Sequence, residues 1–114
     1  MNPTTPTADA DGVVTLQRVA RSLITAEVRA VDLPGTEADQ CDFAVCAALL
    51  TSQALRLLPA GESVDDVPAP AERDPVALLL GAEQLIRAHP IEDLPPGTTA
   101  LVTDLCDLIA RSTR

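Results

Sequence analysis

Apolar side chains recur at intervals of three and four residues in four stretches of this chain, which is the period of one face of an α-helix. These stretches cover residues 13–31, 37–58, 75–89 and 98–112. No segment sustains the alternation of apolar and polar residues that is typical of a half-buried strand. The pattern therefore predicts an all-α fold, a four-helix bundle-like domain.

Local start signals support two of these boundaries. Thr36, followed three residues later by Asp39, resembles a capping box at the start of the second helix. Asp74 and Pro75 are the N-cap and first helical residue that open many helices, here the third. We expect both helices to begin at these residues.

The second helix contains the run FAVCAALL over residues 43–50, which is apolar on every side. A helix with no polar face is usually surrounded by other helices, so this helix is predicted to be central and the most buried. In the third helix, Gly81 costs about 1 kcal/mol relative to alanine. Its presence predicts a close approach of a neighbouring helix at that point.

The segments between the helices predict the domain organisation. Residues 1–11 are polar and rich in Pro and Thr, and we expect a disordered tail. The rest, residues 12–114, forms one domain built from two αα-hairpins, 12–58 and 75–114. The acidic, Pro-rich linker 59–74 between them is expected to be extended or mobile.

Both predicted hairpins contain a similar joint between their helices. The first joint is DLPGT over residues 32–36, and the second is DLPPGT over residues 93–98. Pro, Gly and Thr mark a helix start wherever one occurs, so the likeness has a purely local explanation. A duplicated hairpin, giving a bundle with pseudo-two-fold symmetry, is the other interpretation.

The charge balance narrows the possible partners. The formal net charge is −9, so the chain is repelled by phosphate backbones and by anionic lipid, and no nucleic-acid or membrane partner is expected. The longest apolar run has eight residues, against the roughly 20 that span a bilayer. No secretory signal opens the chain, so three reduced cysteines in a cytoplasmic protein are expected. All basic residues are arginine, which is typical of a GC-rich bacterial genome.

No catalytic, cofactor-binding or metal site is predicted. Cys41 and Cys46 are five residues apart, roughly 140° around a helix, and so do not share a face. His89 is the only histidine, which excludes a two-histidine metal site within one chain. It precedes a proline and is predicted to cap the third helix through the last carbonyls. The cysteines, Cys106 included, are interpreted as small buried hydrophobic residues.

We therefore expect a cytoplasmic module for protein–protein interaction or oligomerisation, an accessory or regulatory protein without catalysis of its own. A chain this small and this aliphatic has more apolar helix surface than one copy can hide, so a homodimer or another protein partner is expected. The first helix is locally basic in an acidic chain. The predicted interaction residues are Arg18, Arg21, Leu23, Arg29 and Phe43.

The alternative is a small helical enzyme or ligand-binding protein with a pocket between the hairpins. Its polar groups would be Cys41, Cys46, Gln53, His89 and Cys106. This alternative requires that several of these side chains converge on one enclosed cavity. A weaker possibility is an oligomer linked by metal through cysteines of several chains.

Overall fold

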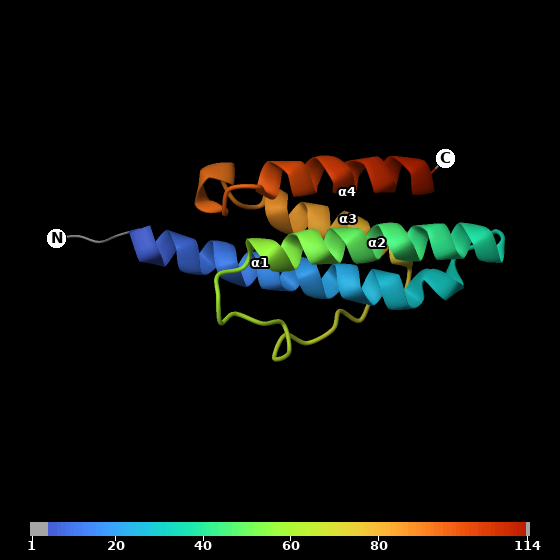
Figure 1. The fold of residues 1–114 in the computed structure, drawn as a ribbon, viewed down its shortest axis with the longest axis horizontal. Helices are drawn as coiled ribbons and strands as arrows, with labels where there is room; N and C mark the ends of the chain where they lie inside the picture. Colours follow the sequence, from blue (N-terminus) through green and yellow to red (C-terminus); the bar gives the residue numbers. More distant parts are fainter. Residues whose placement is uncertain (1–4, 114) are drawn as a thin grey trace.

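In the computed structural model, which describes residues 5–113 and their side chains from residue 11 onward, the predicted periodicities become helices (Figure 1). Within that range the chain forms α1 (Thr5–Val28), α2 (Glu37–Leu57), α3 (Pro75–Arg87) and α4 (Thr98–Ser112), two short 3-10 helices, η1 (Arg29–Asp32) and η2 (Ile91–Asp93), and no strand. The all-α prediction is confirmed.

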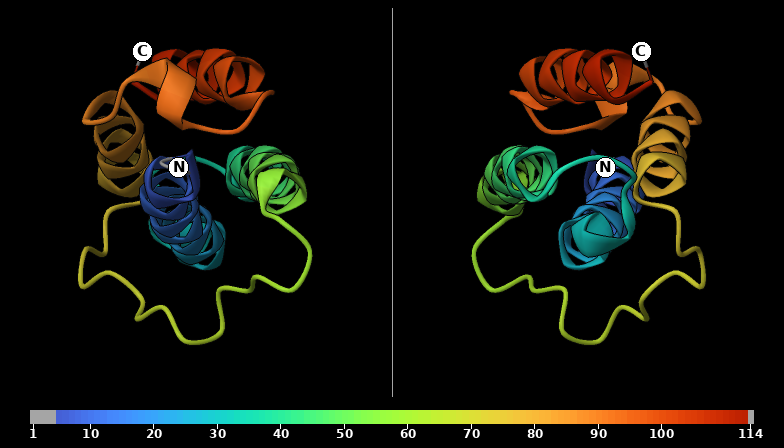
Figure 2. Two further views of the ribbon diagram at one scale, coloured as in Figure 1. Left: turned by 90° about the vertical axis from the view of Figure 1, so that its left-hand side faces the viewer. Right: turned by 90° about the vertical axis from the view of Figure 1, so that its right-hand side faces the viewer.

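The four helices pack as a bundle. Helix α1 lies against α2 on one side and α3 on the other, and α4 contacts both α2 and α3 (Figure 2). Neighbouring helices run antiparallel (Figure 1). The bundle-like arrangement is therefore confirmed. Because α1 packs along α2 and α3 to a similar extent, the chain does not divide into two separately packed hairpins.

The central helix is α1, which corrects the prediction for the second helix. Its fully buried side chains are Leu16, Val19, Ala20, Leu23 and Ala26. Helix α2 instead exposes Val45 and Leu49. An apolar run shows that a helix lacks a polar face, but the number of neighbours decides how much of it is covered. Helix α2 has α1 on one side and α4 on another, and its remaining face is free.

The N-terminal boundary also differs from the prediction. Of the expected tail 1–11, residues 1–4 lie outside the described residues, and residues 5–11 belong to α1. The composition explains this, because Pro6 suits a first helical turn, where its missing N–H has no partner to lose. Positions 8 and 10 are alanines, and alanine is the residue type with the highest helix propensity.

The linker crosses the outer side of α1 on its way from α2 to α3 (Figure 2). We call residues 59–74 the strap. It has no helix or strand, in agreement with an extended linker, but it is anchored to α1. Val64 is buried and Val67 packs against the core, while the Gln17 side-chain amide donates a hydrogen bond of 2.8 Å to the Ser63 carbonyl.

The two joints have similar local structures. Each passes from a 3-10 turn through an extended leucine, and the amide of that leucine donates to a carbonyl three residues earlier at 3.1 Å, from Leu33 and from Leu94. Each then contains a glycine with positive φ, 114° at Gly35 and 100° at Gly97. The shared residue types account for this likeness locally, so duplication stays one of two interpretations.

Both predicted helix starts are confirmed. The Thr36 and Asp39 side chains exchange hydrogen bonds of 3.1 Å with each other's backbone amides, which completes the capping box of α2. The Asp74 carboxylate accepts a hydrogen bond of 3.1 Å from the Val76 amide, with Pro75 at the first helical position of α3. Each of these capping signals involves residues only a few positions apart, so it can be recognised in the sequence.

A close approach of another segment occurs at Gly12 and not at Gly81. A Cβ built at Gly81 meets nothing within 4 Å, so the predicted helix contact at that position is wrong. A Cβ built at Gly12 would overlap the carbonyl oxygen of Asp93 in η2. In the sequence, Gly12 lies at the predicted start of the domain, and no neighbouring residue indicates that a glycine is needed there for packing.

Candidate functional site

A groove separates α2 from α4 over much of their length. It consists of two adjoining hollows that share Leu108 and Arg111 as walls. One hollow, of about 530 Å³, reaches Pro34 and Asp74, and the other, of about 350 Å³, is lined by Leu49 and further residues of the two helices. We call the two together the α2–α4 groove.

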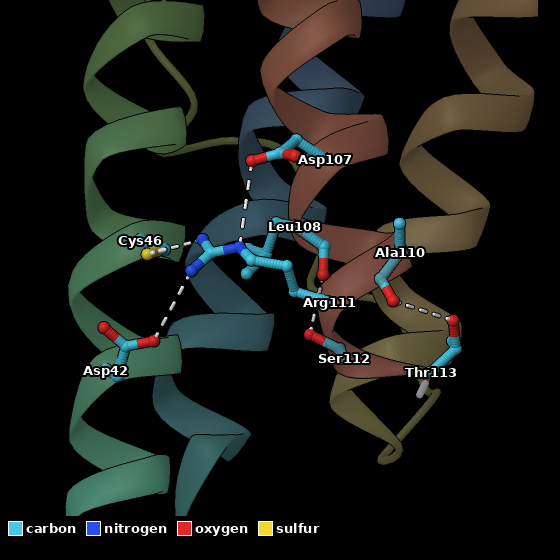
Figure 3. Close-up of polar contacts among 8 residues, drawn as sticks. All are labelled: Asp42, Cys46, Asp107, Leu108, Ala110, Arg111, Ser112 and Thr113. Atoms are coloured by element: carbon cyan, nitrogen blue, oxygen red, sulfur yellow. Dashed lines mark hydrogen bonds and ion pairs between the residues drawn. The ribbon is translucent and has the colours of Figure 1, made fainter.

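Arg111, near the end of α4, bridges this groove (Figure 3). Its Nη2 donates a hydrogen bond of 3.2 Å to Cys46 Sγ, and its Nη1 lies 3.7 Å from Asp42 Oδ2, both on α2. Its Nε lies 3.7 Å from Asp107 Oδ2 on its own helix. The hydrogen bond to Cys46 is the main cause that raises the pKa of Arg111, with the two carboxylates adding to it. The arginine therefore stays charged and ties α4 to α2.

A second polar bridge crosses the groove farther along. Gln53 Nε2 of α2 donates a hydrogen bond of 3.0 Å to Asp104 Oδ2 of α4. Between the two bridges the groove is lined by Leu50 and Leu108, both largely buried. The groove thus has an apolar floor and a polar rim, which is the usual layout of a protein-binding surface.

The outer face of α2 borders this groove and carries exposed apolar side chains. Val45 is 59% exposed and Leu49 is 65% exposed, and the two lie one helical turn apart. Leu49 also lines the groove. A single exposed apolar side chain is ordinary on a protein surface, whereas Val45 and Leu49 form a continuous exposed apolar strip beside the groove.

The predicted interaction residues lie elsewhere. Leu23 and Phe43 are buried in the core of the chain, so neither is available on the surface, and the expectation that they meet a partner is corrected. Arg18 is exposed and lines a hollow beside the strap. Arg21 is half-buried, and Arg29 lies 4.0 Å from Asp32.

Sequence reasoning missed Val45 and Leu49. Both lie inside the apolar run whose other members include Phe43, Ala47 and Leu50, which are buried. Hydropathy is equal on both sides of this helix, so it does not indicate which side faces out. The only available signal was their spacing of four residues, which the buried members of the run also show.

The five polar groups proposed for a pocket do not converge among the described residues. Cys46 and Gln53 line one hollow of the α2–α4 groove, while Cys41 is exposed. Cys106 bonds to α3, and His89 bonds to α1. The condition on which a shared enclosed pocket depends is therefore not met.

His89 does not cap the third helix as predicted. Helix α3 ends at Arg87, two residues before it. The His89 Nε2 and the Thr15 Oγ1 share a hydrogen bond of 2.8 Å, and Thr15 is buried. The imidazole therefore ties the end of α3 to α1, because the chain turns after Arg87 and brings the ring toward that helix.

Cys106 lies in a short polar chain between α4 and α3. Its Sγ donates a hydrogen bond of 3.0 Å to Glu83 Oε2, and the same oxygen accepts a hydrogen bond of 2.8 Å from Arg87. The hydrogen bond to Glu83, together with burial, raises the pKa of the Cys106 thiol. The same bond, with the help of Arg87, lowers the pKa of Glu83. The pair is thus a neutral thiol donating to a carboxylate.

This pairing predicts unequal thiol reactivity. At pH 7.5, Cys106 should be alkylated by iodoacetamide several-fold more slowly than the exposed Cys41, because the thiolate is the nucleophile and Glu83 keeps the Cys106 proton in place. Raising the pH through the elevated pKa should narrow the difference. Peptide mapping by mass spectrometry over a time course measures both rates.

The substitution Glu83→Gln is the control for this prediction. It removes the carboxylate and should speed alkylation of Cys106 while leaving Cys41 unchanged. In urea the two thiols should react at similar rates. Equal rates in the folded protein would contradict the described hydrogen bond.

Two other site classes receive no support within the part of the chain that the structure describes. No group of three or more His, Cys, Asp or Glu side chains gathers in residues 11–113 as a metal site would require. None of the helices in that range has the length and apolar character needed to cross a bilayer.

Comparison with protein families, with curated proteins and with solved structures finds no match to this chain.

Proposed function

We propose that this chain is a cytoplasmic protein-interaction module, without catalysis of its own, that binds a partner helix on the exposed face of α2. The observation that carries the proposal is the pair Val45 and Leu49, which lie exposed beside the apolar floor of the α2–α4 groove. A partner helix packed along this face would cover both side chains and contact the wall of the α2–α4 groove. It would play an accessory or regulatory role through its partner.

Covering this face contributes part of the free energy that binding needs, and the groove wall has to supply the rest. Complete burial of an exposed Val or Leu contributes about 1.5–3 kcal/mol, and these two are somewhat more than half exposed. Covering both contributes on the order of 2–4 kcal/mol before the groove wall is counted.

The charge of the chain favours some partners over others. A formal net charge of −9 repels nucleic acids and anionic lipid, so a protein surface is the partner class that fits. The scattered positions of the three cysteines, Gln53 and His89 give the enzyme or ligand-binding alternative no geometric support.

Site-specific photo-crosslinking tests the proposal. A photoreactive amino acid placed at Leu49 should give discrete covalent adducts to protein in the native cells, identified by mass spectrometry. The same amino acid at Leu80, an exposed leucine on α3, is the matched control and should give none. A folded Leu49 probe that yields no more adduct than the Leu80 probe would contradict the proposed function.

A further inference from the structure

The exposed face of α2 has the spacing of a coiled-coil seam. Its successive positions are separated by four, three, four, three and four residues, which is the heptad repeat. All of them are exposed: Ala38, Asp42, Val45, Leu49, Ser52 and Arg56. Val45 and Leu49 are the large apolar side chains in the middle of this seam, and a stripe of this spacing along one helix fits a partner α-helix that packs nearly parallel or antiparallel to it.

The two ends of the seam carry opposite charges. Asp42 stands one turn before Val45, and its carboxylate is 69% exposed although it also lies near Arg111. Arg56 stands at the other end, is exposed, and makes no hydrogen bond or ion pair with any residue between 11 and 113 that the structure describes. From Asp42 onward the seam therefore carries an acidic, two apolar, one hydroxyl and one basic side chain.

We propose that this seam pairs with the same seam of a second copy of the chain, with the two α2 helices antiparallel. The inference rests on the proposed function and names the partner at that same face. A two-fold axis near the middle of the seam places the Asp42 end of each copy beside the Arg56 end of the other. In this register Leu49 lies at the axis and meets the Leu49 of the second copy, while Val45 lies against Ser52 of the second copy.

The orientation follows from the charges. A parallel pair would set Asp42 against Asp42 and Arg56 against Arg56, with two like-charge contacts. The antiparallel pair makes two opposite-charge contacts and also aligns the helix dipoles favourably. Each copy carries a net charge of −9, which opposes association in general. The pairing of Arg56 therefore specifies the register, while the apolar centre supplies most of the attraction.

The first experiment measures the molar mass of the purified full chain by sedimentation equilibrium across micromolar concentrations. The wild type should be a dimer that dissociates on dilution. Leu49→Glu should be monomeric, because the two-fold axis places two carboxylates in the apolar centre. Leu80→Glu, the same change on α3, should remain dimeric, and circular dichroism verifies that both variants are folded.

The second experiment tests orientation by exchanging charges. Asp42→Arg and Arg56→Asp should each raise the dimer dissociation constant by roughly tenfold, since each change turns two attractions into two repulsions. The double variant should return to within about threefold of the wild type. Asp107→Arg, which also faces Arg111 but lies off the seam, is the matched control and should leave dimerisation unchanged.

Each outcome decides the inference. A wild-type chain that is monomeric at the highest concentration, or a dimer that tolerates Leu49→Glu, overturns it. A double charge variant no better than the single ones overturns the antiparallel arrangement. If the purified chain is monomeric but the Leu49 photo-probe captures a different protein, the self-pairing fails while the proposed function stands. If neither occurs, both fail.

Discussion

Replacing Leu23 with alanine should lower the free energy of unfolding by about 2–5 kcal/mol. Leu23 is fully buried on the central helix α1, so the substitution removes apolar contacts and leaves a cavity. This is a large share of the roughly 5–15 kcal/mol that stabilises a typical domain. Urea denaturation followed by far-ultraviolet circular dichroism measures it, since the chain has no Trp or Tyr to report by fluorescence.

Leu49→Ala is the matched control, because it is the same substitution on an exposed side chain. At protein concentrations low enough to keep the chain monomeric, it should change the free energy of unfolding by no more than about 0.5 kcal/mol. A similar loss at both positions would contradict the description of α1 as the central helix. A loss at Leu49 that grows with concentration would instead reflect self-association.

Gly12→Ala should destabilise the protein by about 1–3 kcal/mol. The added methyl group would overlap the carbonyl oxygen of Asp93, and both groups belong to backbone that has little freedom to move. Alanine is otherwise preferred to glycine within a helix by about 1 kcal/mol. A net loss therefore requires a steric cost greater than that gain.

Gly81→Ala is the companion change. It also lies inside a helix, but a methyl group at that position meets no neighbour, so it should stabilise the protein by about 0.5–1 kcal/mol. Because the propensity gain is shared, the difference between the two variants isolates the contact between α1 and η2. Thermal denaturation of both variants measures it, and stabilisation by both would show that α1 and η2 separate easily.

The exposed apolar face of α2 is a feature that the sequence predicts only in part. The high aliphatic content of this small helical chain predicts an apolar surface that a partner would cover. It did not locate the surface, because Phe43 and Val45 belong to one continuous apolar run and differ only in the direction they face. Leu23 is predicted at the surface because it belongs to the apolar face of the first helix, which the sequence does not assign to the core or to a partner. Its burial depends on α1 having neighbours on both sides.

By itself the sequence determined the helices of residues 37–113 and how they begin. The signals that predict them are the apolar periodicity, the capping box at Thr36 and the Asp74–Pro75 start. Each involves residues close together in the sequence, so it can be recognised without knowledge of the fold. Only the tertiary structure decided which helix is central, which glycine is crowded, and where His89 and the strap are anchored. Each of these features depends on contacts between residues far apart in the chain. The hydropathy pattern does not indicate which distant residues come into contact. The exposure of Val45 and Leu49 on α2 has the same origin, since α1 and α4 cover only two sides of that helix.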